Sequence, residues 1–457
     1  MFRTDSETLE IKEALDFIKQ HKAKRKRYAK LQRYYEGKHD IMELGGADRN
    51  RKNKVVSPYP KYITDFSTGY FMGNAVKYKA TRDDHTDDDE FLEEYLRICN
   101  FNNEAKENLA LAKANSIKGE SFEILWFGLD GQVHFKRVEP DNAFLVYDTS
   151  IDEREKFGVR YHVDSKLNRL ITYVEIYDKD SIFYFNNEAN QSDFVLTDVQ
   201  DHPFGAVPLI HYKNNEELQG DFEQVISLID AYNREQSNTL NDMDQFSDAY
   251  LVLTGYSGST REDIEQMKKD KILLNEADGD AEWLIKSVND AWIENFKNRI
   301  NKDIHKFSFT PDFSDESFGT NVPGVSLKLK LLTSEELRAT KEMFFTEGLR
   351  KRMDLIANYL NMANDHDIIR NEIDIVFSDV LPQNVLELTQ IVQNLSQDVS
   401  TETRLSILPF IENPADEMEK KKKEDEAKAE SDINLYRNFA KDSEDGDKER
   451  EVLEKQE

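Results

Sequence analysis

The sequence predicts a helix-rich α+β protein in which long helices surround a sheet of short strands. Apolar residues recur at helical spacing over residues 6–36, 221–247 and 334–362. Residues 119–212 instead contain short runs rich in aromatic and β-branched residues, which is typical of strands. A loop rich in Asp, Ser, Gly, Asn and Pro, residues 311–325, separates two helical patterns, and a loop this long is usually functional or disordered.

The N-terminal part of the chain is predicted to be largely helical. Residues 6–36 form the first helix, which Gly37 is expected to end, and further helical patterns cover residues 62–71 and 91–118. The basic run HKAKRKRYAKLQR (21–33) has two interpretations: contact with phosphate, or a helix face that is solvated or pairs with acidic neighbours. We favour the second because the chain contains 90 Asp and Glu residues.

The segment 119–212 is predicted to form an antiparallel sheet. Its runs ESFEILWFG, GQVHFKRVE, AFLVYDT, FGVRYHV and ITYVEIYDKDSIFYF are separated by Gly, Asp or Asn. Leu129-Asp130-Gly131 has the composition of a hairpin turn, and VPLIHY, which follows Pro203, adds one more short strand.

Two similar apolar stripes flank a small insert in the second half of the chain. The first stripe comprises Phe222, Val225, Ile226, Ile229, Tyr232, Gln236, Leu240, Met243 and Phe246, and the second comprises Trp292, Phe296, Ile300, Ile304 and Phe307. The insert contains short strand-like and helix-like runs. This arrangement predicts an antiparallel helix pair with a small α/β subdomain at its tip.

The C-terminal part begins with a long helix after the loop. Thr333 and Glu336 match a capping box, and the helix is expected to continue to about Met362. NEIDIVFSD (371–379) reads as a strand that joins the earlier sheet, and residues 381–411 read as a small helical module. Beyond Asn413 the chain is rich in mixed charge and poor in apolar residues, so the tail is predicted to be disordered or weakly helical.

Composition limits the classes of function. The net charge of −29 argues against a sequence-reading DNA-binding protein, yet it allows a protein that surrounds DNA without gripping it. The single cysteine, Cys99, predicts no intrachain disulfide and is expected to be a small core residue. No apolar run approaches the ~18 residues that a membrane span needs, so no membrane partner is expected.

The sequence lacks the common catalytic and metal-binding motifs. It contains no phosphate-binding loop of the type G-x-x-x-x-G-K-[ST], no H-E-x-x-H and no cysteine pair. His305, on the helix before the long loop, is expected to be a partly exposed structural histidine. We therefore predict no catalytic residues, no metal site and no cofactor.

Several long motifs together resemble the portal proteins, or head-to-tail connectors, of tailed bacteriophages that infect Gram-positive bacteria. They are YYEGKHDI (34–41), NKVVSPYPKYITDFSTGYFMGNAV (53–76), FSDAYLVLTG (246–255) and IHKFSFTPDFSDESFGTNVPGVSLKLKLL (304–332), in the expected order. The resemblance covers roughly residues 30–380 and does not extend to the C-terminal tail.

The resemblance implies a homo-oligomeric ring, usually of twelve subunits, at one vertex of the capsid. Double-stranded DNA would enter through the channel during packaging and leave through it during ejection. The implied partners are the terminase, head-completion or adaptor proteins, the scaffold and the major capsid protein. The protein would be found in the virion, after assembly in the host cytoplasm.

The resemblance also implies a division of the chain into the parts of a portal subunit: an α/β wing, a helical stem, a small α/β clip, a long bent helix after a tunnel loop, and a helical crown. The ranges are 1–220 for the wing, completed by a strand near 371–379; 221–248 and 289–310 for the two stem helices; 249–288 for the clip; 311–325 for the tunnel loop; 326–370 for the long helix of the wing; 381–415 for the crown; and 416–457 for the charged tail.

Two groups of residues are candidates for contact with DNA. The tunnel loop would line the channel with Asp315, Glu316, Ser317, Phe318, Gly319, Thr320, Asn321, Val322, Pro323 and Gly324. On the polar side of the second stem helix, twelve-fold repetition would turn Lys297, Lys302 and Lys306 into basic rings, and Asp312, Asp315 and Glu316 would form acidic ones. Our hypothesis is that the two kinds of ring together guide DNA loosely and let it slide.

Two other functions remain open at this point. The chain could be a DNA-packaging accessory enzyme, which would need a phosphate loop or a compact carboxylate triad. It could also be a nucleic-acid-binding protein that attaches through residues 21–33, which predicts tight binding that weakens steeply with salt.

Overall fold

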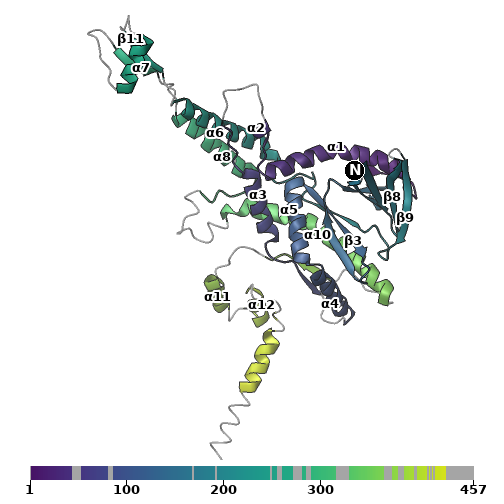
Figure 1. The fold of residues 1–457 in the computed structure, drawn as a ribbon. Coiled ribbons are helices and arrows are strands. Elements are labelled where there is room, and N and C mark those ends of the chain that lie inside the picture. The colour runs from purple at the N-terminus through teal and green to yellow at the C-terminus, as the bar shows by residue number, and fades with distance from the viewer. Residues whose placement is uncertain are drawn as a thin grey trace, which may run out of the picture. The chain divides into compact units, whose positions relative to one another are not determined.

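The computed structural model describes most of the chain and divides it into two compact units, residues 1–380 and 381–457. The described residues are 2–43, 53–80, 86–166, 169–190, 193–246, 250–254, 260–270, 280–284, 290–314, 329–364, 373–378, 385–395, 399–408, 411, 414 and 417–428. The fold is of the mixed α+β class, as the sequence predicts (Figure 1).

The first unit opens with five helices within its described residues. They are α1 (Ile11–Tyr35), α2 (Asp40–Glu43), α3 (Tyr59–Met72), α4 (Thr86–Phe101) and α5 (Glu104–Lys118). Helices α1, α3, α4 and α5 cover the predicted helical regions, whereas α2 was not predicted. Gly37 ends α1 as predicted: its φ is +80°, and the amides of Gly37 and Lys38 donate back to Tyr34 and Arg33. The helical region 91–118 is divided, because Asn103 takes a left-handed backbone with φ of +53° between α4 and α5.

The strands of the first half form two sheets rather than the single one predicted. The larger has the order β1-β5-β6-β7-β8-β9, with β1 parallel to β5 and all other pairs antiparallel. Its strands are β1 (Phe2–Arg3), β5 (Ala143–Tyr147), β6 (Glu155–Lys166), β7 (Arg169–Tyr177), β8 (Ser181–Asn190) and β9 (Asp193–Asp201). The smaller has the order β10-β3-β4, with β3 (Glu120–Phe127), β4 (Val133–Val138) and β10 (Leu209–Lys213). Gly131, in the predicted hairpin turn between β3 and β4, has a φ of +73°.

The strand predicted near 371–379 is present, but its predicted partner is wrong. This strand, β13 (Ile373–Val376), pairs antiparallel with β2 (Lys77–Ala80) and not with the sheets of residues 119–212. The sequence analysis did not assign β2, because a four-residue strand is too short for its alternation to stand out. The pair lies against the main core, where Tyr78 and Ile373 are buried.

The helix pair and its insert follow the predicted order. After the short turn η1 (Glu223–Val225), α6 (Ile226–Phe246) leads to β11 (Tyr250–Thr254), α7 (Arg261–Asp270) and β12 (Asp280–Leu284), and α8 (Asp290–Phe307) returns beside α6 (Figure 1). Strands β11 and β12 pair antiparallel. Helix α10 (Leu332–Asn364) then packs along β10 and across α3 and α4, and its residues from Phe345 to Leu360 line the main core.

The second unit is helical in its described part. It contains α11 (Val385–Asn394) and α12 (Thr401–Ser406), and the Ser400 hydroxyl caps α12 by accepting from the amide of Thr403. Residues 417–428 also form a helix, so the predicted disordered or weakly helical tail is helical at its start.

Candidate nucleic-acid interface on helix α8

The C-terminal half of helix α8 is held to the body of the first unit by buried apolar residues. Ile300 and Ile304 are buried in a cluster with Phe222, Val225 and Ile229, which lie at the start of the α6 stripe. Toward the insert the same two stripes become exposed: Leu240 and Met243 on α6 are 38% and 62% exposed, and Trp292 and Phe296 on α8 are 60% and 36% exposed. The name stem is used below for α6 and α8 together.

The side of α8 that faces away from its buried residues carries a row of cations. Arg299, Lys302 and Lys306 are all exposed, and at 100° per residue they fall within about 60° of the helix circumference. Among the residues that the structure describes, no carboxylate forms an ion pair with any of these three side chains, although the Lys306 ammonium lies 5.5 Å from the ring centroid of Phe307. We call these three residues the basic arc.

The structure brings together two of the three predicted stem lysines. Lys302 and Lys306 belong to the basic arc, whereas Lys297 lies about 140° from Lys302 around the helix. The Lys297 side chain is only 15% exposed, and its ammonium pairs with Glu294 at 2.9 Å. Sequence reasoning missed Arg299, although the spacing of residues 299, 302 and 306 at i, i+3 and i+7 is itself a helical-face signal.

The first residues of the long loop are anchored to α3 and α8. The hydroxyl of Tyr62 donates to the carbonyl of Pro311 at 2.8 Å, and the amide of Asn301 donates to Asp312 at 2.9 Å. Tyr59 donates in turn to Asn301 at 2.6 Å. Partial burial acts to raise the pKa of Asp312, but hydrogen bonds from Ser314 and Asn301 outweigh it, so that its pKa is lowered and the carboxylate form is favoured.

The turn between α8 and the loop is fixed from two more sides. His305 contacts the Thr310 carbonyl through Nδ1 at 3.1 Å and is half-buried, as expected for a structural histidine. Phe309 takes a left-handed backbone with φ of +55°, and its carbonyl accepts from the buried hydroxyl of Ser334 on α10 at 2.8 Å. Helix α10 already includes Leu332, one residue before the predicted cap at Thr333. The predicted tunnel-loop residues Asp315 to Gly324 lie outside the described residues.

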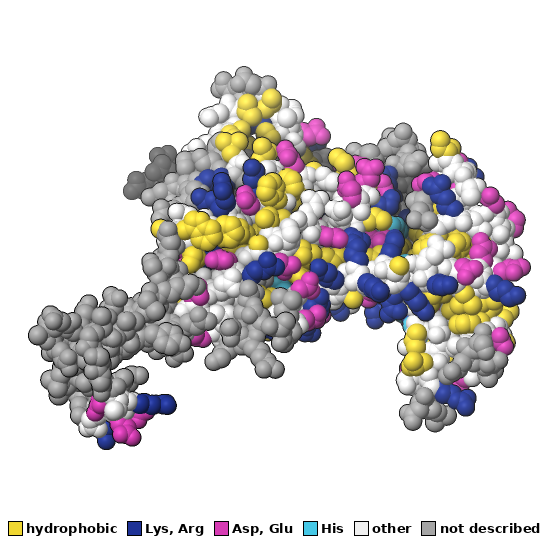
Figure 2. Space-filling view, turned by 90° about the horizontal axis from the view of Figure 1, so that it is seen from above, with side chains coloured by type: hydrophobic (Ala, Val, Ile, Leu, Met, Phe, Trp, Pro, Cys, Tyr) yellow, Lys and Arg dark blue, Asp and Glu magenta, His cyan; other side chains and the backbone are white. Residues whose placement is uncertain are grey.

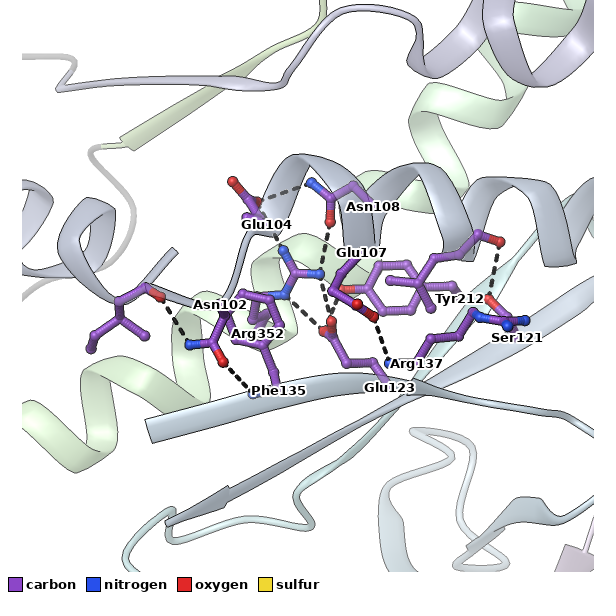
Figure 3. A network of polar contacts seen from close by, with 12 residues as sticks. Asn102, Glu104, Glu107, Asn108, Ser121, Glu123, Phe135, Arg137, Tyr212 and Arg352 are labelled. Carbon is purple, nitrogen blue, oxygen red and sulfur yellow. Dashed lines mark hydrogen bonds and ion pairs between the residues drawn. The ribbon is translucent and has the colours of Figure 1, made fainter. Parts of the chain in front are cut away.

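Helix α10, which follows the loop in the chain, is fixed to the rest of the first unit by buried charge (Figure 3). The guanidinium of Arg352 is fully buried and donates to both oxygens of Glu123 at 2.7 Å, to Glu104 at 2.8 Å and to Asn108 at 2.8 Å. Tyr212 donates to the same Glu123 carboxylate at 3.0 Å. This network connects α10 with α5, β3 and β10.

A second buried ion pair holds α10 nearer its start. The ammonium of Lys341 lies 2.8 Å from both oxygens of Asp221 and 2.7 Å from Asn214. Burial alone would raise the pKa of Asp221, but the Lys341 ammonium and the hydroxyl of Ser116 lower it, so the carboxylate stays charged.

The basic run 21–33 on α1 is partly paired with acidic neighbours and partly solvated, as the favoured interpretation predicts. Arg27 lies 2.6 Å from Glu223, and Arg33 and Lys30 lie 2.5 Å and 3.1 Å from Asp40. On the face shown in Figure 2, Lys and Arg side chains are interspersed with Asp and Glu. A phosphate-binding face needs cations that are not already neutralised. Lys22 and Lys26 of the same run are exposed, and neither forms an ion pair among the residues described, so pairing accounts for only part of the run.

The remaining chemical features are structural. Cys99 is buried, and burial raises the pKa of its thiol far above the ordinary value. Within the described ranges, no cluster of His, Cys, Asp and Glu has the makeup of a metal site. None of the described helices combines the length and hydropathy required to cross a bilayer.

A match over most of its length places this chain in the class of phage portal proteins. More particularly, it belongs to the family of phage portal proteins described as SPP1 Gp6-like, whose family model matches residues 15–431. The chain is similar to the portal protein of Bacillus phage SPP1, with 24% identity over 425 residues, which are 88% of this chain and 81% of that relative. It is also similar to the portal protein of Clostridium phage phiCD119, with 22% identity over 389 residues, 78% of this chain and 84% of the relative.

A solved structure supports the fold. A chain in the neck of an empty GTA particle, computed with C6 symmetry, superposes with a TM-score of 0.50 at 13% identity, covering 81% of this chain and 93% of that one. The resemblance to portal proteins noted from sequence motifs is therefore confirmed. As a portal protein, the chain is a virion component of the portal vertex, and portal proteins assemble as oligomeric rings.

Proposed function

We propose that twelve copies of this chain form a ring whose channel admits double-stranded DNA during packaging and releases it during ejection, with the basic arc of α8 facing the channel. The observation that carries this proposal is the basic arc itself. In a chain of net charge −29, three exposed cations that form no ion pair with any described residue gather on one side of one helix. The acidic surface of the chain repels DNA at long range, so DNA is expected to pass where a local row of cations reduces that repulsion.

The basic arc is expected to bind DNA weakly enough that the DNA can move past it. Arg299 and Lys306 are seven residues apart, so the charged rows of a ring would span about 10 Å along the helix. Each phosphate that is neutralised adds counterion-release free energy, and a long basic channel would therefore hold DNA in place. A short basic band next to acidic residues such as Asp303 allows DNA to slide.

The other parts of the chain have proposed roles that follow from their positions. Residues 1–220, the long helix within 326–370 and strand β13 would form the wing that contacts the scaffold and major capsid protein. The insert at 249–288 would be the clip that binds the terminase and later the head-completion proteins, and residues 381–415 would form the crown. We propose no enzymatic role and no cofactor, and assembly in the host cytoplasm before incorporation into the capsid.

The basic arc is tested by neutralising it in the full-length chain. In R299Q/K302Q/K306Q, we expect rings of normal mass, but severalfold less DNA per particle after packaging. The matched control is K297Q, which removes a cation of the same helix that is already paired with Glu294 and turned away from the arc. Particles of the triple variant that fill with a complete genome at the normal rate would contradict a channel-facing arc.

The tunnel loop is tested separately. Its first residues are fixed by Tyr62, Asn301 and Ser334, so a deletion beyond them leaves the anchoring contacts in place. Removing Phe318 to Gly324 is expected to spare ring formation and to impair packaging or retention of DNA. Normal packaging and retention by this deletion would show that the segment is not a tunnel loop.

The ring itself is tested by the mass and symmetry of the assembled particle, measured by light scattering and negative-stain imaging. A large annular particle with weak DNA binding is expected. A stable monomer that binds DNA tightly would instead indicate a nucleic-acid-binding protein, and DNA cleavage or nucleotide hydrolysis by the purified chain would indicate a packaging enzyme.

A further inference from the structure

A cleft of about 540 Å³ lies between the two sheets of the first unit. The sheets pack on each other at the base of the cleft, where Phe122 and Val138 of the small sheet meet Tyr177 and Ile182 of the large one. Beyond this base, strands β3 and β4 line one wall of the cleft and strands β6 to β9 line the other. The volume lies within the range of about 300–1,000 Å³ that is usual for binding pockets.

The wall formed by the small sheet carries a cation beside an aromatic ring. The register pairs Ile124 with Lys136 and Trp126 with His134, so these four side chains lie on the same face as the base of the cleft. Lys136 is exposed, and it forms no ion pair with any residue that the structure describes. Trp126 is 37% exposed and stacks on His134 with ring centroids 5.1 Å apart. This wall therefore offers an available positive charge next to a partly exposed indole ring.

The wall formed by the large sheet contains a neutralised ion pair and a polar atom without a partner. The register places Arg160 beside Glu175, and one terminal nitrogen of the guanidinium lies 2.6 and 2.8 Å from the two carboxylate oxygens. His162 follows on the same face of its strand and stacks on Tyr173. Its Nδ1 atom is buried and has no hydrogen-bond partner among the described residues. Buried polar atoms are nearly always satisfied, so a group from outside the chain can bind favourably at this position.

The charges of the cleft leave a cation without a counter-charge. The carboxylates of Glu139 and Glu175 both form ion pairs with lysine or arginine side chains. By the register, Asp201 lies on the same side of its strand as Val199, on the face of the large sheet that packs against α1, so its carboxylate is directed away from the cleft. Lys136 therefore remains as the group that an incoming anion can neutralise.

We propose that this cleft binds an acidic polypeptide segment of a partner protein. A carboxylate of the segment would lie between Lys136 and Nδ1 of His162, and a neighbouring apolar side chain would enter the base of the cleft beside Ile124 and Ile182. The inference rests on the proposed role of the wing in contacting the scaffold and the major capsid protein, and it names the site and the chemistry of one such contact.

The residue types of the lining favour a polypeptide over nucleic acid. Trp, Tyr and Arg are the residues that contribute most of the binding free energy at contacts between proteins. The cleft is lined by five side chains of these types, namely Trp126, Arg137, Arg160, Tyr177 and Tyr184. A single available lysine, by contrast, is too few for the row of cations that neutralises a phosphate backbone.

The first test captures the partner in assembling particles. A photoreactive phenylalanine analogue replaces Trp126 in the full-length chain, which is produced together with the other capsid components. We expect a cross-link to a second polypeptide of the particle, with Asp or Glu within a few residues of the attachment point. A cross-link only to another segment of this chain, or to a peptide without an acidic residue, would overturn the proposal.

The second test reverses the charge of the available cation. In the chain that carries the analogue, K136E is expected to lower the yield of the cross-link severalfold. The matched control is K106E, which changes the charge of an exposed lysine on α5 that does not line the cleft and forms no ion pair with a described residue. Both lysines are exposed, so both variants should keep the circular dichroism spectrum of the wild type. Equal cross-link yields for K136E and K106E would contradict the assignment.

Native mass spectrometry of the purified chain tests whether the ligand is a small molecule instead. The mass is expected to be that of the polypeptide alone. A small acid that copurifies with the wild type and with K106E, but not with K136E, would overturn the choice of a polypeptide.

The outcomes separate the inference from the proposed function. A second photoreactive analogue at Leu170, which is 66% exposed on strand β7, reports contacts of the wing outside the cleft. If position 170 captures the scaffold or capsid protein and position 126 captures no other protein, the wing role stands and the cleft is wrong. If neither position captures another protein, the wing role fails and the cleft fails with it.

Discussion

Replacing Arg352 with methionine is expected to destabilise the protein strongly. The substitution removes the guanidinium that contacts Glu123, Glu104 and Asn108, while methionine retains much of the apolar volume between the rings of Phe135 and Tyr212. Glu123 is fully buried and would keep only the hydrogen bond from Tyr212. Removing one partner of a buried ion pair typically costs about 3–5 kcal/mol, because the other charge remains unpaired in a medium of low dielectric constant.

The loss should depend on pH in a defined direction. Burial already raises the pKa of Glu123, and the Arg352 guanidinium opposes that effect. Without the guanidinium the pKa of Glu123 rises further above its value in the unfolded chain. A carboxyl group with a raised pKa destabilises the fold as pH rises through that pKa, and protonation at lower pH relieves the cost. The stability deficit of R352M should therefore shrink as the pH is lowered from 7 toward 5.

The assay is urea denaturation of the subunit followed by circular dichroism, at several pH values. The matched control is K297M, which breaks a pair whose acidic partner Glu294 is 61% exposed and is expected to cost less than about 1 kcal/mol. Adding Glu123→Gln to R352M should restore part of the stability, since it removes the stranded charge. A loss for R352M no larger than that for K297M, or one independent of pH, would refute this account of the network.

Two further predictions concern other parts of the first unit. His21 is buried beneath Tyr161, and burial, followed by the nearby Lys24 ammonium, lowers its pKa to about 4. Between pH 6.5 and 4 the unfolded chain binds a proton at this histidine that the folded chain does not, so the free energy of unfolding should fall with decreasing pH by up to ~3 kcal/mol. H21N should make the free energy of unfolding, measured by urea titration, less dependent on pH. The same pH dependence in both proteins would contradict this prediction. Gly348→Ala places a Cβ 2.4 Å from the Tyr212 ring and should lower the free energy of unfolding by about 1–3 kcal/mol, whereas Gly69→Ala on α3, where the new Cβ meets no atom within 4 Å, should gain up to about 1 kcal/mol. Equal effects of the two alanines in the same denaturation assay would show that Tyr212 does not restrict α10.

Local patterns were sufficient for the helices, because a helix satisfies its backbone within its own sequence. The stripes from Phe222 to Phe246 and from Trp292 to Phe307 correctly gave α6 and α8, and Gly37 correctly gave the end of α1. The same stripes could not show which of their apolar residues are buried and which are exposed. Ile304 and Trp292 belong to the same stripe, but Ile304 is fully buried and Trp292 is 60% exposed.

Strand pairing was less accessible, because alternation identifies the two faces of a strand but not its neighbour. Residues 119–212 therefore gave strands correctly but not their division into two sheets. At the outer edge of β4, side chains take the place of a neighbouring strand. Asn102 donates to the Val133 carbonyl at 2.9 Å and accepts from the Phe135 amide at 3.1 Å. This protection of the edge depends on the turn between α4 and α5, where Asn103 has a left-handed backbone. The turn brings Asn102 beside β4, which the sequence pattern does not reveal.

The polar residues of α6 explain how the stem is tied to the root of the loop. Asn241, Ser237 and Asn233, spaced by four residues and buried, accept from the amides of Asn53, Val55 and Ser57 at 2.9, 2.9 and 2.8 Å. Four residues of helix rise about 6 Å and two residues of extended chain span about 6.6 Å, so each turn of α6 meets every second amide of the segment.

That segment leads directly into α3, whose Tyr59 and Tyr62 hold Asn301 and the Pro311 carbonyl. Helix α6 is therefore bound twice: its apolar side packs on α8, and its polar side binds the segment 53–57, which leads into the helix that holds the start of the loop. An apolar stripe alone would let the two stem helices slide along each other, because apolar contact is non-directional. The row of directed hydrogen bonds fixes the register of α6 against residues 53–57. Because this segment continues into α3, which holds Pro311, the bonds also fix where along α6 and α8 the loop begins.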